Sequence, residues 1–130
     1  LLMYHRQDYE ASERFFNRLL QDYQDVFYGF DARGHLLKIY YETNDMRGLE
    51  SLLHSFRMFL DRNKDVAPEK RRQYVTFLNH LRKLLNIPLN DRGRIEKLKK
   101  EILEKESKGM GISWLIEKID VLLGEKIEKP

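Results

Sequence analysis

The stretch KIYYETNDMRGLESLLHSF, residues 38–56, resembles an earlier stretch of the same chain, LLMYHRQDYEASERFFNRL, residues 1–19. In both, an apolar helical segment leads through a short polar turn into a second amphipathic helix that begins near an aspartate, Asp8 or Asp45. The other matched pairs are Tyr4 and Tyr41, Met3 and Tyr40, Phe16 and Leu53, and Leu19 and Phe56. This internal repeat predicts one helical unit used twice.

The composition narrows the class of protein. The 130 residues fit one domain with its own core, and the many charged and helix-forming residues predict an all-α fold. The chain has no cysteine, which excludes thiol catalysis and thiolate zinc sites and fits a reducing, cytoplasmic location. No run of about eighteen apolar residues is present, so we expect no membrane-spanning helix. The chain does not begin with methionine, and we expect it to be a piece of a longer protein.

Apolar residues at three- and four-residue spacing predict five to six helices. The turn at 1–4 is the expected end of a truncated helix, and the full helices are expected at 8–23, 25–43, 45–62, 68–86, 91–108 and 112–123. Asp25 and Asp45 are the expected N-caps, and Gly29 and Gly34 predict either close helix contacts or a bend. We expect a single domain over 1–130, with repeat-like hairpins over 1–88 and a C-terminal hairpin cap over 89–130.

The periodicity also predicts which side chains are buried. In the second helix the expected buried stripe includes Phe27 and Phe30, and Tyr28 is expected to lie off it. The 91–108 helix offers only a narrow stripe for burial, formed by Ile95, Leu98 and Ile102.

The central motif resembles the tetratricopeptide repeat family over roughly residues 1–60. The matching features are Leu36 and Tyr40, the turn TND at 43–45, and then Leu49, Leu53 and Phe56; the earlier copy has Met3, the turn RQD, Ser12, Phe16 and Leu19. The sequence departs from the family at Leu37, where glycine is preferred, and at Leu49, where a small residue is preferred. Its spacing is 37 rather than about 34 residues, and no proline closes either repeat.

The resemblance implies a right-handed α-solenoid of helical hairpins. In that family the first helix of each repeat lines a concave surface that holds a peptide or partner helix. Carried onto this chain, the residues that face the groove are Asp31, His35, Lys38 and Glu42. A weaker resemblance links 36–64 to large bacterial helical-repeat proteins. An irregular helical bundle with a chance internal match is the alternative interpretation.

Motifs for catalysis or for cofactor and metal binding are not found in the sequence. The four histidines (His5, His35, His54 and His80) form no HExxH or similar ligand pair, and we expect them at the surface or its boundary. No GxSxG, GxGxxG or P-loop pattern occurs either. We therefore expect a non-enzymatic protein-binding scaffold that uses no cofactor.

Positive charge gathers in the second half of the chain, where residues 67–130 hold fifteen lysines and arginines against ten acidic residues. The candidate basic patch on the 68–86 helix consists of Lys70, Arg71, Arg72, Arg82 and Lys83. It supports an alternative function, binding of nucleic acid or another polyanion, although acidic residues interleave with the lysines of the tail. A third alternative is a structural cap of a longer repeat array. Its truncated N-terminal face would be apolar and would favour self-association.

Overall fold

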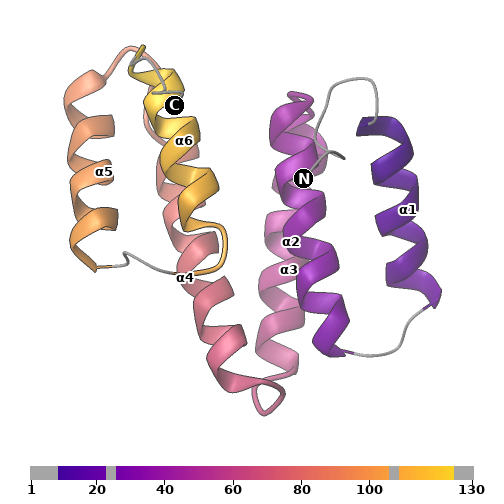
Figure 1. Ribbon diagram of the computed structural model, residues 1–130. Coiled ribbons are helices and arrows are strands. Elements are labelled where there is room, and N and C mark those ends of the chain that lie inside the picture. Colours follow the sequence, from indigo (N-terminus) through magenta and orange to yellow (C-terminus); the bar gives the residue numbers. More distant parts are fainter. Residues whose placement is uncertain (1–8, 23–25, 106–108, 125–130) are drawn as a thin grey trace, which may run out of the picture. The chain divides into compact units, whose positions relative to one another are not determined.

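The computed structural model describes residues 9–22, 26–105 and 109–124, and these contain α-helices and no strands (Figure 1). The helices are α1 (Tyr9–Asp22), α2 (Val26–Glu42), α3 (Met46–Arg62), α4 (Pro68–Leu85), α5 (Arg92–Lys105) and α6 (Ile112–Leu122). Each lies within a range expected from the apolar periodicity, so the prediction of an all-α fold is confirmed. The expected helix end at 1–4 and the Asp25 cap lie outside the described residues.

The chain divides into two compact units, Leu1–Arg71 and Arg72–Pro130. The expected subdivision lay further along, between residues 88 and 89. The observed division falls within α4 because the buried side chains beyond its first turn pack with the C-terminal hairpin. One example is Phe77, whose ring meets that of Trp114 edge to face at 6.1 Å.

In the first unit, α2 packs on α1 with one side and on α3 with another. Phe16, Ala32 and Ile39 form a buried cluster between α1 and α2. On the other side, Phe30 meets Phe59 of α3 edge to face at 5.7 Å. A Cβ atom on Gly29 would lie only 3.2 Å from the Phe59 ring, so this glycine permits a close helix contact.

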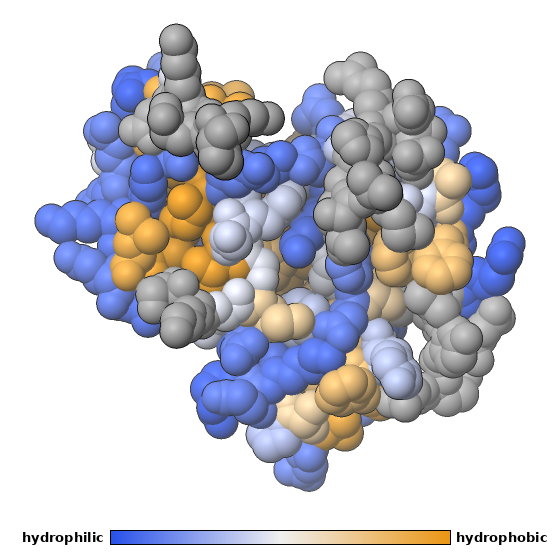
Figure 2. Space-filling view, in the orientation of Figure 1, coloured by the Kyte–Doolittle hydropathy of each residue, from blue (hydrophilic) through white to orange (hydrophobic). Residues whose placement is uncertain are grey.

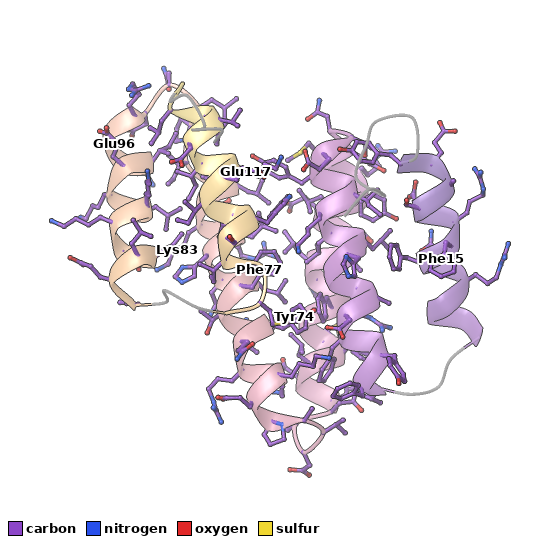
Figure 3. All side chains as sticks on the ribbon, viewed as in Figure 1. Phe15, Tyr74, Phe77, Lys83, Glu96 and Glu117 are labelled. Carbon is purple, nitrogen blue, oxygen red and sulfur yellow. The ribbon has the colours of Figure 1, made fainter. Side chains whose placement is uncertain are left out.

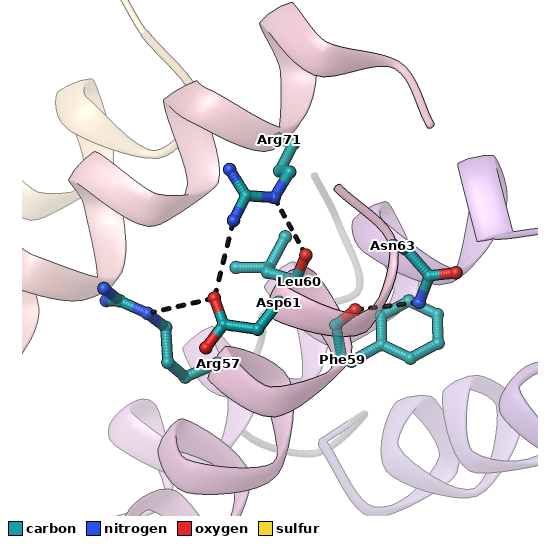
Figure 4. A network of polar contacts seen from close by, with 6 residues as sticks. All are labelled: Arg57, Phe59, Leu60, Asp61, Asn63 and Arg71. Carbon is teal, nitrogen blue, oxygen red and sulfur yellow. Dashed lines mark hydrogen bonds and ion pairs between the residues drawn. The ribbon is translucent and has the colours of Figure 1, made fainter. Parts of the chain in front are cut away.

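Short polar connections fix the ends of α3. The Gly48 amide donates to the Asp45 carboxylate at 2.9 Å, which confirms Asp45 as the N-cap. At the other end, Asn63 donates to the Phe59 carbonyl at 2.8 Å, and Arg71 donates to the Leu60 carbonyl, also at 2.8 Å (Figure 4). Because these bonds satisfy carbonyls of the last turn of α3, they hold the loop into α4.

The second unit joins most of α4 to the α5–α6 hairpin. Ile95, Leu98 and Ile102 are buried as expected, and Lys99 pairs with Asp120 of α6 at 2.7 Å. Hydrophobic residues also reach the surface over this hairpin (Figure 2), where Leu103 and Val121 are exposed. No helix in the described ranges is long and apolar enough to cross a membrane.

Two expectations about burial are wrong. Phe27 is 44% exposed, because it lies on the open side of α2 with the Lys70 ammonium 3.7 Å from its ring centre. His80 is only 5% exposed, because it lies on the buried side of α4 with Phe77 and Leu84. Of the other described histidines, His35 is half-buried and His54 is exposed.

Candidate functional site

One side of α2 carries six of its exposed or half-buried polar and aromatic residues. Successive α-helical residues are rotated by about 100°, so the positions of this set fall within a stripe roughly 100° wide. Two members are aromatic and clearly exposed, and the four polar members are half-buried. We call this set the α2 face: Phe27, Tyr28, Asp31, His35, Lys38 and Glu42.

The N-terminal end of the α2 face contacts the start of α4. The Lys70 ammonium lies 2.6 Å from the Asp31 carboxylate and over the Phe27 ring. Neighbouring Tyr28, at 61% exposure, meets Phe27 edge to face. This end therefore combines an ion pair with two aromatic rings that reach solvent, and the expectation that Tyr28 lies off the core is confirmed.

The middle of the α2 face lies beside α1. The His35 imidazole stacks on the Phe16 ring, with centroids 5.0 Å apart and planes 10° from parallel. Burial lowers the pKa of His35 below its usual value; nearby Lys38 lowers it further, and Asp31 opposes both effects. Burial also lowers the pKa of Lys38. The four residues expected to face a groove thus share one side of α2, and at least two of them already contact neighbouring helices.

The five residues of the candidate basic patch are divided between the two units. Lys70 and Arg71 belong to the first unit, where Lys70 pairs with Asp31 and Arg71 binds the Leu60 carbonyl and Asp61. The other three belong to the second unit. Of these, Arg82 and Lys83 line a hollow between α4 and α5.

This hollow has a volume of about 510 Å³ and is lined by polar side chains from the second half of α4 and from α5. On the α5 side, the Glu101 carboxylate lies 2.8 Å from the Lys83 ammonium and 3.6 Å from that of Lys105. The hydrogen bond from Lys83 lowers the pKa of Glu101, and Lys83 and Lys105 add to this by their charge. We call this space between the two helices the α4–α5 hollow.

The sequence interpretation missed the α5 side of this hollow. The sequence analysis named no residue of α5 as part of a site, and two of them, Glu101 and Lys105, line this hollow. Their four-residue spacing does predict that they are neighbours on α5. The proximity of Glu101 to Lys83, eighteen residues away, depends on how the α4 and α5 helices pack, which no local pattern encodes.

The residues that the structure describes contain no group of three histidines or carboxylates placed to hold a metal ion. Comparison with known proteins finds no matching family model, no matching curated protein and no matching solved structure.

Proposed function

We propose that this chain is a protein-interaction module without catalytic activity, and that the α2 face binds a peptide or a helix of the partner. The observation that carries the proposal is the continuous stripe of partly exposed residues on α2. Two exposed aromatic rings, Phe27 and Tyr28, stand at one end of it. Aromatic side chains are enriched in protein interfaces because they bury a large area at low entropic cost.

The charges of the α2 face suit a partner of mixed charge. Asp31 and Glu42 alternate with Lys38 along the helix, and the neutral form of His35 is favoured by its burial. A partner with both signs of charge would find complementary groups along the stripe, whereas a strongly acidic one would meet two carboxylates.

The packing of the first unit supports a repeat-like arrangement of hairpins. The α2 helix contacts both the helix before it and the helix after it, as in stacked hairpins. The Asp31–Lys70 pair joins α2 to the first turn of α4 across 39 residues, close to the spacing of 37 in the internal sequence match. In a tetratricopeptide-like solenoid, α2 and α4 would be the first helices of successive repeats, and such helices together line the concave surface.

Selection of binding peptides from a displayed random library would test the α2 face. We expect Tyr28→Ala and Lys38→Ala to weaken the binding of the selected peptides about tenfold or more, because both side chains reach the surface of the α2 face. Phe15→Ala is the matched control, since Phe15 is an exposed aromatic residue of α1 outside the stripe. If Phe15→Ala weakens binding as much as the two α2 variants do, the α2 face is not the binding surface.

The mixed charge also predicts a negative result. Calorimetric titration with a peptide ending in EEVD should give no micromolar binding that depends on the α2 face, because Asp31 and Glu42 oppose an acidic C-terminus there. Micromolar binding on the α2 face, lost in Lys38→Ala, would contradict the proposed specificity.

Nucleic-acid binding is the second candidate function, supported by the cations on the polar side of α4 in the second unit. Arg72 and Lys83 are exposed there, eleven residues and so about three helical turns apart. A gel shift that is steep in salt and is lost when both are reversed to glutamate would favour this function. Arg71 is less informative in this test, because its guanidinium holds the end of α3.

A further inference from the structure

We propose that the α4–α5 hollow binds a carboxylate side chain of an acidic peptide segment, and that Glu101 occupies this position until the peptide displaces it. The hollow lies entirely in the second unit, whereas the α2 face lies in the first. It is therefore a second binding site, and its failure in an experiment would leave the proposed role of the α2 face untouched.

The first observation is that the hollow already holds a carboxylate. Glu101 reaches two ammonium groups, from Lys83 on α4 and from Lys105 one turn further along α5. Its side chain retains 28% exposure, so it is accessible to exchange rather than sealed in the core. Exposed ion pairs of this kind contribute little stability, about 0–1 kcal/mol, so a competing carboxylate can replace Glu101 at small cost.

The second observation is the excess of positive charge. Three cations line the hollow, Arg82, Lys83 and Lys105, and Glu101 is the single carboxylate among the described lining residues. None of the ion pairs found between described residues involves Arg82. Because the guanidinium can bind a carboxylate through two parallel hydrogen bonds, Arg82 provides the first contact for an incoming acidic side chain.

The remaining lining groups favour a peptide. Thr76, Asn79 and Asn86 place a hydroxyl and two amides along the α4 side, and such groups can bond to a peptide backbone. Sites for single-stranded nucleic acid instead present aromatic side chains on which the bases stack. The described lining includes no phenylalanine, tyrosine or tryptophan, and its only ring is that of the buried His80. The volume, about 510 Å³, is within the usual range for small binding sites, ~300–1,000 Å³.

Fluorescence polarisation with a labelled oligoglutamate peptide and the whole 130-residue chain tests the proposal. We expect binding that weakens as salt rises, and Glu101→Gln should tighten it about three- to tenfold by removing the internal competitor. Glu96→Gln is the matched control: it removes the same charge from an exposed residue of α5 that does not line the hollow (Figure 3). Its effect should be under about twofold at ~0.15 M salt, because the charge is screened.

A second pair of variants covers the case in which Glu101→Gln disturbs folding. Arg82→Gln should weaken the oligoglutamate complex about three- to tenfold, since Arg82 is exposed and its loss breaks no ion pair seen among the described residues. Arg47→Gln, an exposed arginine of the first unit, removes the same charge and should change affinity little. Equal effects within each pair, or no oligoglutamate binding, would overturn the proposal. Binding of oligo(dT) that is tighter than oligoglutamate and depends on Arg82 would overturn it in favour of nucleic acid.

Discussion

The Asp31 carboxylate and the Lys70 ammonium lie 2.6 Å apart, although 39 residues separate them along the chain. Their side chains are 34% and 18% exposed, so solvent screens the pair only in part. The same ammonium lies 3.7 Å from the centre of the Phe27 ring, whose π face attracts a cation. A single lysine at the start of α4 thus contacts two residues of α2 and fixes one end of the α2 face.

Lys70→Ala should therefore destabilise the first unit by about 1–2 kcal/mol, because the ion pair and the cation–π contact are lost together. Urea unfolding followed by far-UV circular dichroism measures the change. Lys64→Ala is the control, since Lys64 lies exposed in the loop between α3 and α4. An equal, small effect of both substitutions would mean that the contacts of Lys70 add no stability.

The pKa of His35, lowered mainly by burial, makes the stability of the first unit depend on pH. Above the unfolded-state pKa of 6.5 the imidazole is neutral in both states, and its stabilising contribution is fully present. As the pH falls below 6.5, the unfolded chain takes up a proton that the folded chain resists. Stability is then lost until the pH has passed the lower, folded pKa.

Melting temperatures measured between about pH 7 and pH 5 test this expectation. Wild type should lose more stability over this interval than His35→Gln, which lacks the titrating group but keeps a polar side chain. His54→Gln, at an exposed position of α3, should behave as wild type. A titration of the His35 ring protons by NMR with a midpoint above 6.5 would contradict the expected direction.

The helices could be predicted from the sequence because each depends on apolar spacing and on local end signals such as Asp45 and Pro68. What the sequence did not predict depends on neighbours distant in the chain. His80 has the same local surroundings as an ordinary surface histidine, and its burial follows from how α4 packs within the second unit. Phe27 fits an apolar stripe by spacing, yet the side of α2 to which it belongs is left open in the first unit.

The candidate sites divide in the same way. The polar members of the α2 face lie on one helix, so their common side follows from the helical period alone. The α4–α5 hollow needs Glu101 beside Lys83, which requires the relative placement of two helices. Helix packing of this kind depends on how the side-chain ridges of one helix fit the grooves of the other along their whole contact, and no short sequence motif predicts it.

The cap of α3 gives a local test of stability. Asp45→Ala removes the side chain that accepts the Gly48 amide and should cost about 1 kcal/mol. Asp45→Asn should restore most of the loss, because an amide oxygen also accepts this bond. Asp65→Ala, an exposed aspartate of the next loop, serves as the control for loss of one negative charge. If alanine and asparagine at position 45 behave alike, the cap hydrogen bond is not the cause.

Alanine substitutions at three glycines of the second unit can distinguish the cost of backbone strain from the cost of a steric clash. Gly111 is the N-cap of α6, with φ at 77°, and a Cβ atom there would lie 2.6 Å from Cε1 of the fully buried Phe77 ring. Gly124 has a similar φ of 72°, but a Cβ atom would meet nothing within 4 Å. At Gly93, inside α5, the nearest atom would be 3.9 Å away and the backbone is helical.

We expect Gly111→Ala to be the most harmful of the three substitutions, at about 2–4 kcal/mol, because left-handed strain adds to displacement of a core ring. Gly124→Ala should cost about 1 kcal/mol from strain alone. Gly93→Ala should be neutral or stabilise by about 0.5–1 kcal/mol, since alanine favours a helix. Trp114, the only tryptophan, contacts Phe77, so its fluorescence during urea unfolding reports this unit directly. Equal losses at 111 and 124 would show that the Phe77 ring moves aside freely and that strain alone sets the cost.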